Sequence, residues 1–137
     1  MSAQLVVVDS SVAVKWFVHE GENHVPAALD LLQGHLDGVV TLAAPEHLRL
    51  EVLNALRYRK LDDVHLLEAA DRLDLVQLQW FAVDGALARS AVALSGKYPL
   101  TIYDAVFTAL AKRLDCDLVT DDRQFAESGA CQVRALG

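Results

Sequence analysis

Two short apolar runs, far apart in the sequence, each end in carboxylate side chains. Residues 5–8 read Leu-Val-Val-Val and lead into Asp9, and residues 118–120 lead into Asp121 and Asp122. A continuous run of this kind is typical of a parallel strand that is buried on both faces. Because neighbouring parallel strands end at the same edge of a sheet, we expect these distant acids to meet there.

Helical segments separate nearly every pair of strands that the sequence predicts. Apolar residues recur at helical spacing, which predicts helices over residues 10–18, 25–36, 46–59, 62–75, 84–95 and 100–114. The other strands are predicted at residues 39–44, at 79–83 and, as a short edge strand, at 132–134. Parallel neighbours need such crossovers. The pattern therefore predicts an α/β fold, a three-layer α/β/α sandwich with a Rossmann-like parallel sheet of four or five strands.

The composition suits one domain with a large core. The chain has 137 residues, of which 53% are apolar, so we expect a single domain over residues 1–137. We find no apolar window of about 18 residues and no export signal at the start, which predicts a soluble, cytoplasmic protein without a membrane span. The two cysteines, Cys116 and Cys131, are expected to be free thiols in a reducing compartment.

The charge balance argues against a protein that coats nucleic acid. The chain carries 12 basic and 19 acidic residues, a formal net charge of −7, and a phosphate backbone would be repelled by such a surface. A local basic rim could still capture a single RNA strand if several acids were neutralised by metal ions. The distribution of charge therefore matters more than its sum.

Two of the acids at this predicted edge have competing interpretations. Asp9 could simply cap the helix that follows it, although capping and metal binding do not exclude one another. In a helical projection Glu51 lies beside Leu48 and Ala55, at the margin of the apolar stripe, where Asn54 could orient it. An exposed glutamate paired with a nearby arginine is the alternative for Glu51.

Two further acids lie near the C-terminal predicted strand and helix. Asp104 follows Thr101 at the spacing of a capping box, in which the acid would fold back on the first helical turn. It also lies at the edge of the apolar face, from which it could point along the edge of the sheet. Asp122, or less favourably Asp121, could cap a short helix that begins near Arg123. Four clustered carboxylates would repel one another unless a divalent cation held them together, and oxygen ligands favour Mg²⁺ or Mn²⁺ over zinc.

Four segments resemble the PIN-domain ribonucleases, and within them the VapC-type toxins of bacterial toxin–antitoxin pairs. Each motif is weak alone, but the four occur in the family's order and at family-like spacing from Val6 to about Phe125. They are the opening strand with D-x-S (Asp9 to Ser11), the P…E-x-x-N element (Pro45, Glu51, Asn54), the Y-D-A helix start (Tyr103 to Ala105) and the L-V-T-x-D ending (Leu118 to Asp122).

The resemblance implies a single PIN domain that acts as an endoribonuclease dependent on Mg²⁺ or Mn²⁺. It also implies a homodimer and a cognate antitoxin whose tail covers the site. The catalytic, metal-binding acids would be Asp9, Glu51, Asp104 and Asp122, with Ser11, Asn54 and Thr120 as supporting polar residues. Asp121 departs from the pattern, since the position before the last acid is variable in the family. It could compete with Asp122 or bind in the outer shell.

Five basic residues are candidates for RNA contacts: Lys15, Arg57, Arg59, Lys60 and Arg123. The charges at 57–60 could equally well stabilise the C-terminal end of a helix. Tyr103 and Trp16 are expected in the core and not under RNA bases. Two other classes of function remain as alternatives, namely a non-catalytic interaction module on the same fold and a receiver- or phosphatase-like phosphotransfer domain.

Overall fold

The sheet is parallel throughout, and its central strand comes from the beginning of the chain. The computed structural model describes residues 3–137. Its strands lie in the order β3-β2-β1-β4-β5, and every pair is parallel. They are β1 (Gln4–Val8), β2 (Val40–Pro45), β3 (Gln79–Phe81), β4 (Asp117–Thr120) and β5 (Val133–Ala135). The predicted parallel sheet is confirmed, and the segment near residue 133 is an edge strand as expected.

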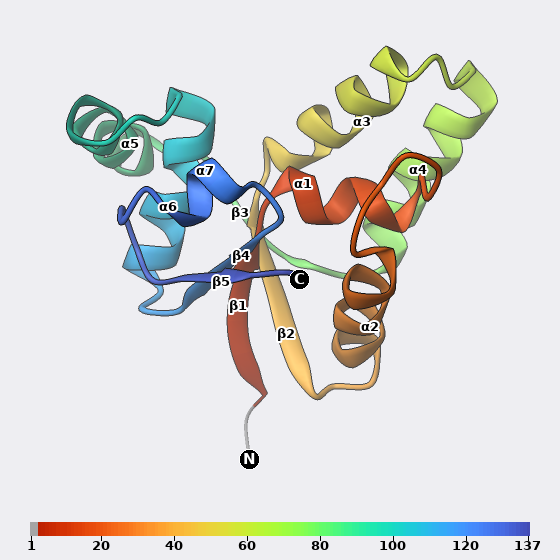
Figure 1. Ribbon diagram of the computed structural model, residues 1–137, viewed down its shortest axis with the longest axis horizontal. Coiled ribbons are helices and arrows are strands. Elements are labelled where there is room, and N and C mark those ends of the chain that lie inside the picture. Colours follow the sequence, from red (N-terminus) through yellow and green to blue (C-terminus); the bar gives the residue numbers. More distant parts are fainter. Residues whose placement is uncertain (1–2) are drawn as a thin grey trace.

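Helices cover both faces of this sheet. In Figure 1, α1 to α4 lie on one side of the sheet, and α5 and α6 lie on the other. The helices are α1 (Ser10–Ala13), the 3-10 helix η1 (Val14–Trp16), α2 (Val25–Leu36), α3 (Leu48–Tyr58), α4 (Asp63–Leu75), α5 (Gly85–Lys97), α6 (Ile102–Arg113) and α7 (Arg123–Ala126). The three-layer α/β/α sandwich is therefore confirmed. Within residues 3–137, no helix is long and apolar enough to cross a membrane.

The position of β1 explains its uninterrupted apolar sequence. Strands β2 and β4 flank it, and Val6, Val7 and Val8 are all 0% exposed. Val8 pairs with Val119 in the register of β1 and β4. The residues that follow these two strands therefore leave the sheet at the same edge.

Helix α6 is buried around most of its circumference. Every residue from Ala105 to Ala111 is buried, since the helix packs on β1, β2 and β4 and is covered by α5 from outside. A helix with apolar neighbours on all sides loses the clear polar face of a surface helix. This packing fixes the first turn of α6 against the carboxyl ends of the central strands.

The helix predicted over residues 10–18 is shorter than expected. It consists of one α-helical turn in α1 and continues as η1, which ends at Trp16. The residues from Val12 to Trp16 are all buried, whereas an α-helix at a surface buries only a stripe. The tighter 3-10 winding, which often ends short helices, is accompanied by a hydrogen bond from the Trp16 indole N–H to the carbonyl oxygen of Ala28 (3.0 Å).

Candidate active site

Asp9 lies at the end of β1 and is held by hydrogen bonds on both carboxylate oxygens. Ser11 Oγ donates to Oδ1 at 2.6 Å, and the Thr120 hydroxyl at the end of β4 donates to Oδ2. The backbone N–H of Val12 also donates to Oδ1 (3.3 Å), so Asp9 caps α1 as well. The side chain of Asp9 is thus oriented by residues from both ends of the chain.

Burial makes this carboxylate costly to ionise. Asp9 is only 4% exposed, and burial raises its pKa to about 6, against the hydrogen bonds from Ser11, Thr120 and Val12 that lower it. The charge of Asp104 raises the pKa further. An acid that is buried, like-charged with its neighbour and rigidly oriented is typical of a functional site.

Glu51 points from α3 toward the same edge, and one of its oxygens has no partner. Its side chain is 26% exposed, yet Oε1 is buried without a hydrogen bond among the described residues. Burial, together with the charges of Asp104 and Asp9, raises the pKa of Glu51 to about 7, although a hydrogen bond from Ser10 lowers it. The interpretation of Glu51 as an exposed, arginine-paired helix residue is therefore wrong.

Asp104 lies in the first turn of α6 and also belongs to the acid cluster. Thr101 caps α6 by accepting a hydrogen bond from the Asp104 backbone N–H (3.1 Å), as the capping-box spacing predicts. Burial and the charge of Asp122 nevertheless raise the pKa of the Asp104 carboxyl, while a hydrogen bond from Thr101 lowers it. The structural and the electrostatic interpretations of Asp104 hold at the same time.

The two adjacent aspartates after β4 have different surroundings. Asp122 caps α7 by accepting from the Phe125 N–H (3.2 Å), and its own N–H donates to Thr120 Oγ1 (3.0 Å). Asp121 instead forms ion pairs with Lys15 (2.9 Å) and His24 (2.8 Å). Of the two, Asp122 is the one whose charge reaches the other acids.

The four acids fit a divalent cation chemically. In the part of the chain that the structure describes, no three histidine, cysteine or acidic side chains already stand close enough to hold an ion. The site does supply only oxygen donors, and these include the unpartnered Oε1 of Glu51 and three carboxyl groups whose pKa values are raised. Burial is the main cause of the raised pKa values, and the neighbouring carboxylates add to it. A bound Mg²⁺ or Mn²⁺ would favour the ionised form of all these acids.

Two residues that the sequence analysis did not assign to the site contact Glu51. Ser10 donates the hydrogen bond that lowers the pKa of Glu51. His47 Nε2 lies 3.7 Å from Glu51 Oε1 and donates to the Tyr103 carbonyl oxygen (3.1 Å), while burial lowers the pKa of His47. The four-residue spacing of His47 and Glu51, which puts both on one helix face, is the signal that could have identified His47.

The candidate RNA contacts have different environments. Lys15 is 2% exposed and bound to two carboxylates, so it cannot reach RNA as predicted. Arg57 pairs with Asp63 at the surface, and Arg59 pairs with Glu22. Lys60 and Arg123 are exposed.

The two aromatic residues expected in the core differ from each other. Trp16 is buried, at 7% exposure, as predicted. Tyr103 is 65% exposed, so its expected place in the core is wrong. Its ring lies on His47, with 6.2 Å between ring centroids and 27° between ring planes. The seven buried residues of α6 begin only at Ala105, and Tyr103 precedes them.

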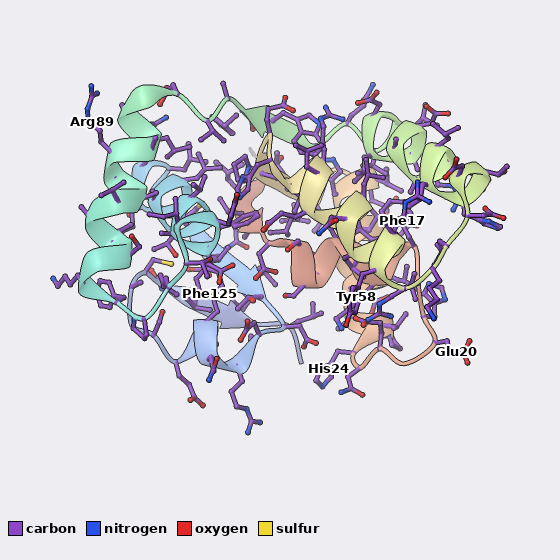
Figure 2. All side chains as sticks on the ribbon, turned by 90° about the horizontal axis from the view of Figure 1, so that it is seen from above. Phe17, Glu20, His24, Tyr58, Arg89 and Phe125 are labelled. Carbon is purple, nitrogen blue, oxygen red and sulfur yellow. The ribbon has the colours of Figure 1, made fainter. Side chains whose placement is uncertain are left out.

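An apolar groove adjoins the acids, and the sequence analysis did not identify it. It has a volume of about 950 Å³ and lies between α3, α4 and the start of α6, lined among others by Leu50, Asn54, Leu67 and Tyr103. Leu50 and Leu67 are 71% and 67% exposed. Figure 2 looks onto this edge of the sheet and shows Arg89 pointing away from the molecule on the outer face of α5. No described residue of α5 lines the groove.

Comparisons with known proteins agree with this geometry. A sequence profile of the PIN domain family matches residues 6–130, whereas no curated protein sequence is significantly similar. The fold is similar to VapC20 of Mycobacterium tuberculosis, described as a Sarcin-Ricin loop cleaving toxin (TM-score 0.72, 19% identity, 94% of this chain and 98% of that chain covered). It is also similar to a toxin–antitoxin complex from Klebsiella pneumoniae (0.67, 21%, 96% and 98%) and to DNA-bound VapBC from Salmonella typhimurium (0.67, 12%, 100% and 100%).

The profile match extends from β1 through the end of α7, and so it includes all four predicted acids. The structural likenesses, at identities of 21% and below, independently support the fold. The chain belongs to the PIN domain family.

Proposed function

We propose that the protein is a metal-dependent endoribonuclease and the toxin of a VapBC-type toxin–antitoxin pair. The observation that carries the proposal is that the starts of α1, α3, α6 and α7 bring four acids to one edge of the sheet, where Glu51 Oε1 is buried without a partner among the described residues. The charges of Asp9 and Asp104 raise the pKa of Glu51, and that of Asp122 raises the pKa of Asp104. Like charges held near one another repel, and a bound divalent cation would relieve this repulsion.

Asp9, Glu51, Asp104 and Asp122 would hold Mg²⁺ or Mn²⁺, which when bound activates water and stabilises charge on phosphoryl oxygens. Ser11 and Thr120 keep Asp9 in one orientation through hydrogen bonds to both of its oxygens. Oε1 of Glu51 has no donor and is therefore free to bind a cation or to accept a proton from the attacking water. Asp122 is presented by the capped start of α7.

RNA positioning falls to residues around the acids. Arg123 follows Asp122 directly and is exposed. Arg57, Arg59 and Lys60 lie together at the end of α3, where Arg57 borders the apolar groove. Arginines bind phosphates well because their planar donors match two oxygens. Arg123 and Lys60 are therefore the proposed contacts in place of buried Lys15, together with Arg57 and Arg59 once RNA displaces Asp63 and Glu22 from them.

The alternative functions find less support. A non-catalytic interaction module would be expected to lack one of the acids, but all four are present and coupled. The match to the PIN domain family leaves a receiver- or phosphatase-like domain without support.

The direct test is RNA cleavage by the purified protein with and without metal. We expect cleavage in Mg²⁺ or Mn²⁺, its loss when EDTA is added, and its return when metal is restored, because the acids need a counter-ion to act. Expression in a bacterial host should arrest growth, and co-expression of a cognate antitoxin should relieve the arrest. Undiminished cleavage in excess EDTA would contradict the proposal.

The apolar groove is the proposed binding site of the antitoxin. Solved structures of similar fold are described as toxin–antitoxin complexes, and the exposed Leu50 and Leu67 beside Glu51 would be covered by an antitoxin tail that also blocks the site. If the antitoxin occupies the groove, the homodimer implied by the family resemblance would form through another face of the protein.

Leu67→Glu is expected to weaken binding of the cognate antitoxin by about 10- to 100-fold, since burying a leucine contributes about 1.5–3 kcal/mol. RNA cleavage by the isolated variant should remain. The matched control is Val92→Glu on α5, where the valine is 60% exposed and far from the groove. Titration calorimetry measures both affinities. If Leu67→Glu keeps full affinity and instead turns a dimer into a monomer, the groove is the dimer face.

A further inference from the structure

A buried lysine lies directly behind the acids. Lys15 in η1 is 2% exposed, although lysines are almost never fully buried unless they are paired. Its Nζ lies 2.8 Å from Glu22 Oε1 and 2.9 Å from Asp121 Oδ2. The lysine therefore joins the loop after η1 to the loop after β4.

The partners of Lys15 are themselves occupied on their second oxygens. Asp121 Oδ1 lies 2.8 Å from His24 Nδ1, and Glu22 Oε2 pairs with Arg59. His24 lies at the margin of the molecule in Figure 2. Because both oxygens of Asp121 are engaged, this carboxylate is not free to bind a cation among the other acids.

The charges of this cluster support one another. Burial alone would lower the pKa of Lys15, but the hydrogen bonds and charges of Glu22 and Asp121 outweigh burial and raise it. Burial likewise acts to raise the pKa of Asp121, yet Lys15 and His24 hold it below its usual value. Lys15, Glu22 and Asp121 therefore stay ionised at neutral pH.

The backbone transmits the position of Asp121 to Asp122. The Asp121 N–H donates to Ser11 Oγ (2.9 Å), and Ser11 in turn donates to Asp9. The Asp122 N–H donates to Thr120 Oγ1 (3.0 Å), and Thr120 in turn donates to Asp9. While the side chain of Asp121 is held toward Lys15, the backbone of Asp122 is thus bound to a residue that orients Asp9.

We propose that Lys15 is a positioning residue, which keeps Asp121 out of the acid cluster and thereby presents Asp122 to Asp104 and Asp9. The inference rests on the proposed function, because it assumes that these acids bind a divalent cation. The two adjacent aspartates then have different roles. Asp121 anchors the loop after β4, and Asp122 belongs to the proposed cation site.

The test measures the affinity of the RNA-free protein for Mn²⁺. Electron paramagnetic resonance detects the free ion during the titration, at a temperature below unfolding. Lys15→Met should weaken Mn²⁺ binding by about tenfold or more, as loss of a supporting partner commonly does. The double variant Lys15→Met with Asp121→Asn should regain most of the affinity, because no freed carboxylate then competes with Asp122. Lys15→Arg should stay close to the wild type.

Asp121→Asn alone keeps the test decisive if Lys15→Met does not fold. We expect its Mn²⁺ affinity to remain within about threefold of the wild type, since Asp121 is not a ligand, whereas Asp122→Asn should lose at least about tenfold. If Lys15→Met melts earlier but binds Mn²⁺ like the wild type, the lysine is only structural and the inference is wrong. Absence of Mn²⁺ binding by the wild type would instead overturn the proposed metal site itself.

Discussion

Asp9→Asn and Asp122→Asn are each expected to lower RNA cleavage at saturating Mg²⁺ by at least about 100-fold, more than the loss of an outer partner of a metal site usually costs. Both variants should still fold, because asparagine caps a helix about as well as aspartate and Asp9 and Asp122 are the caps of α1 and α7. What is lost is the charge that would hold the proposed cation. Binding of the antitoxin should persist in both.

The matched control for these variants is Asp117→Asn. Asp117 begins β4, the strand that ends at Thr120, and pairs with Arg134 at the opposite edge of the sheet from the acids. Its loss should leave cleavage near the wild-type rate. Circular dichroism checks folding, and the initial rate of cleavage of a labelled RNA gives the activity. Full cleavage by Asp9→Asn or Asp122→Asn would remove these acids from the proposed site.

The second large effect concerns stability without metal, which should fall as the pH rises from about 5 to 8. The pKa of Asp9 is raised from 3.8 to about 6 and that of Glu51 from 4.5 to about 7. Between these limits the folded protein binds more protons than the unfolded chain, so stability is lost as the pH increases. One pKa unit corresponds to about 1.4 kcal/mol. Ionisation of buried Asp9 therefore lowers the free energy of unfolding by about 3 kcal/mol above pH 7.

Asp9→Asn should therefore stabilise the metal-free protein at pH 8 by about 2–3 kcal/mol, less whatever the amide loses in hydrogen bonds. The same substitution should have little effect near pH 4, where Asp9 is already protonated in the folded state. Adding Mg²⁺ at pH 8 should stabilise the wild type and not the variant. Thermal unfolding at both pH values, with and without metal, measures these differences.

The wild type must be compared with Asp9→Asn because His65 also makes the folded protein less stable as the pH rises. Asp62 raises the pKa of exposed His65, so the stability that this pair contributes is also lost as the pH rises through the pKa of His65. The contribution of His65 cancels when the free energy of unfolding of Asp9→Asn is subtracted from that of the wild type at each pH. An equal loss of stability between pH 5 and 8 in both proteins would show that Asp9 is not the cause.

The sheet could be predicted from the sequence because its strands carry their own signal. The apolar run before Asp9 is too continuous for a surface strand, and it forms the centre of the sheet. The helix over residues 10–18 was harder, because the spacing of Val12 and Trp16 fits an α-helix. Only packing on all sides explains why the segment is buried throughout and partly 3-10.

The positions of the acids carry a similar signal, since Asp9, Asp104 and Asp122 follow strand or loop ends and Glu51 lies at the margin of an apolar helix stripe. Their joint role as a metal site stays a prediction. The surroundings of single side chains were not predictable in this way. Lys15 was expected at the surface because lysine usually is, and only the fold brings Glu22 and Asp121 to it. Tyr103 was expected in the core because its helix is strongly apolar, yet it lies ahead of the buried part of α6.

The order of strands in the sheet also determines when the protein can become active during its synthesis. Asp9 follows β1, and the neighbour of β1 on one side is β4. β4 lies more than a hundred residues later in the chain. Contacts of such separation form late, because the intervening chain must first be closed into a loop. A nascent chain that has not yet released Asp122 from the ribosome lacks one acid and the Thr120 hydroxyl that orients Asp9. On the proposed function, cleavage would therefore begin only after the ribosome has released this last part of the site.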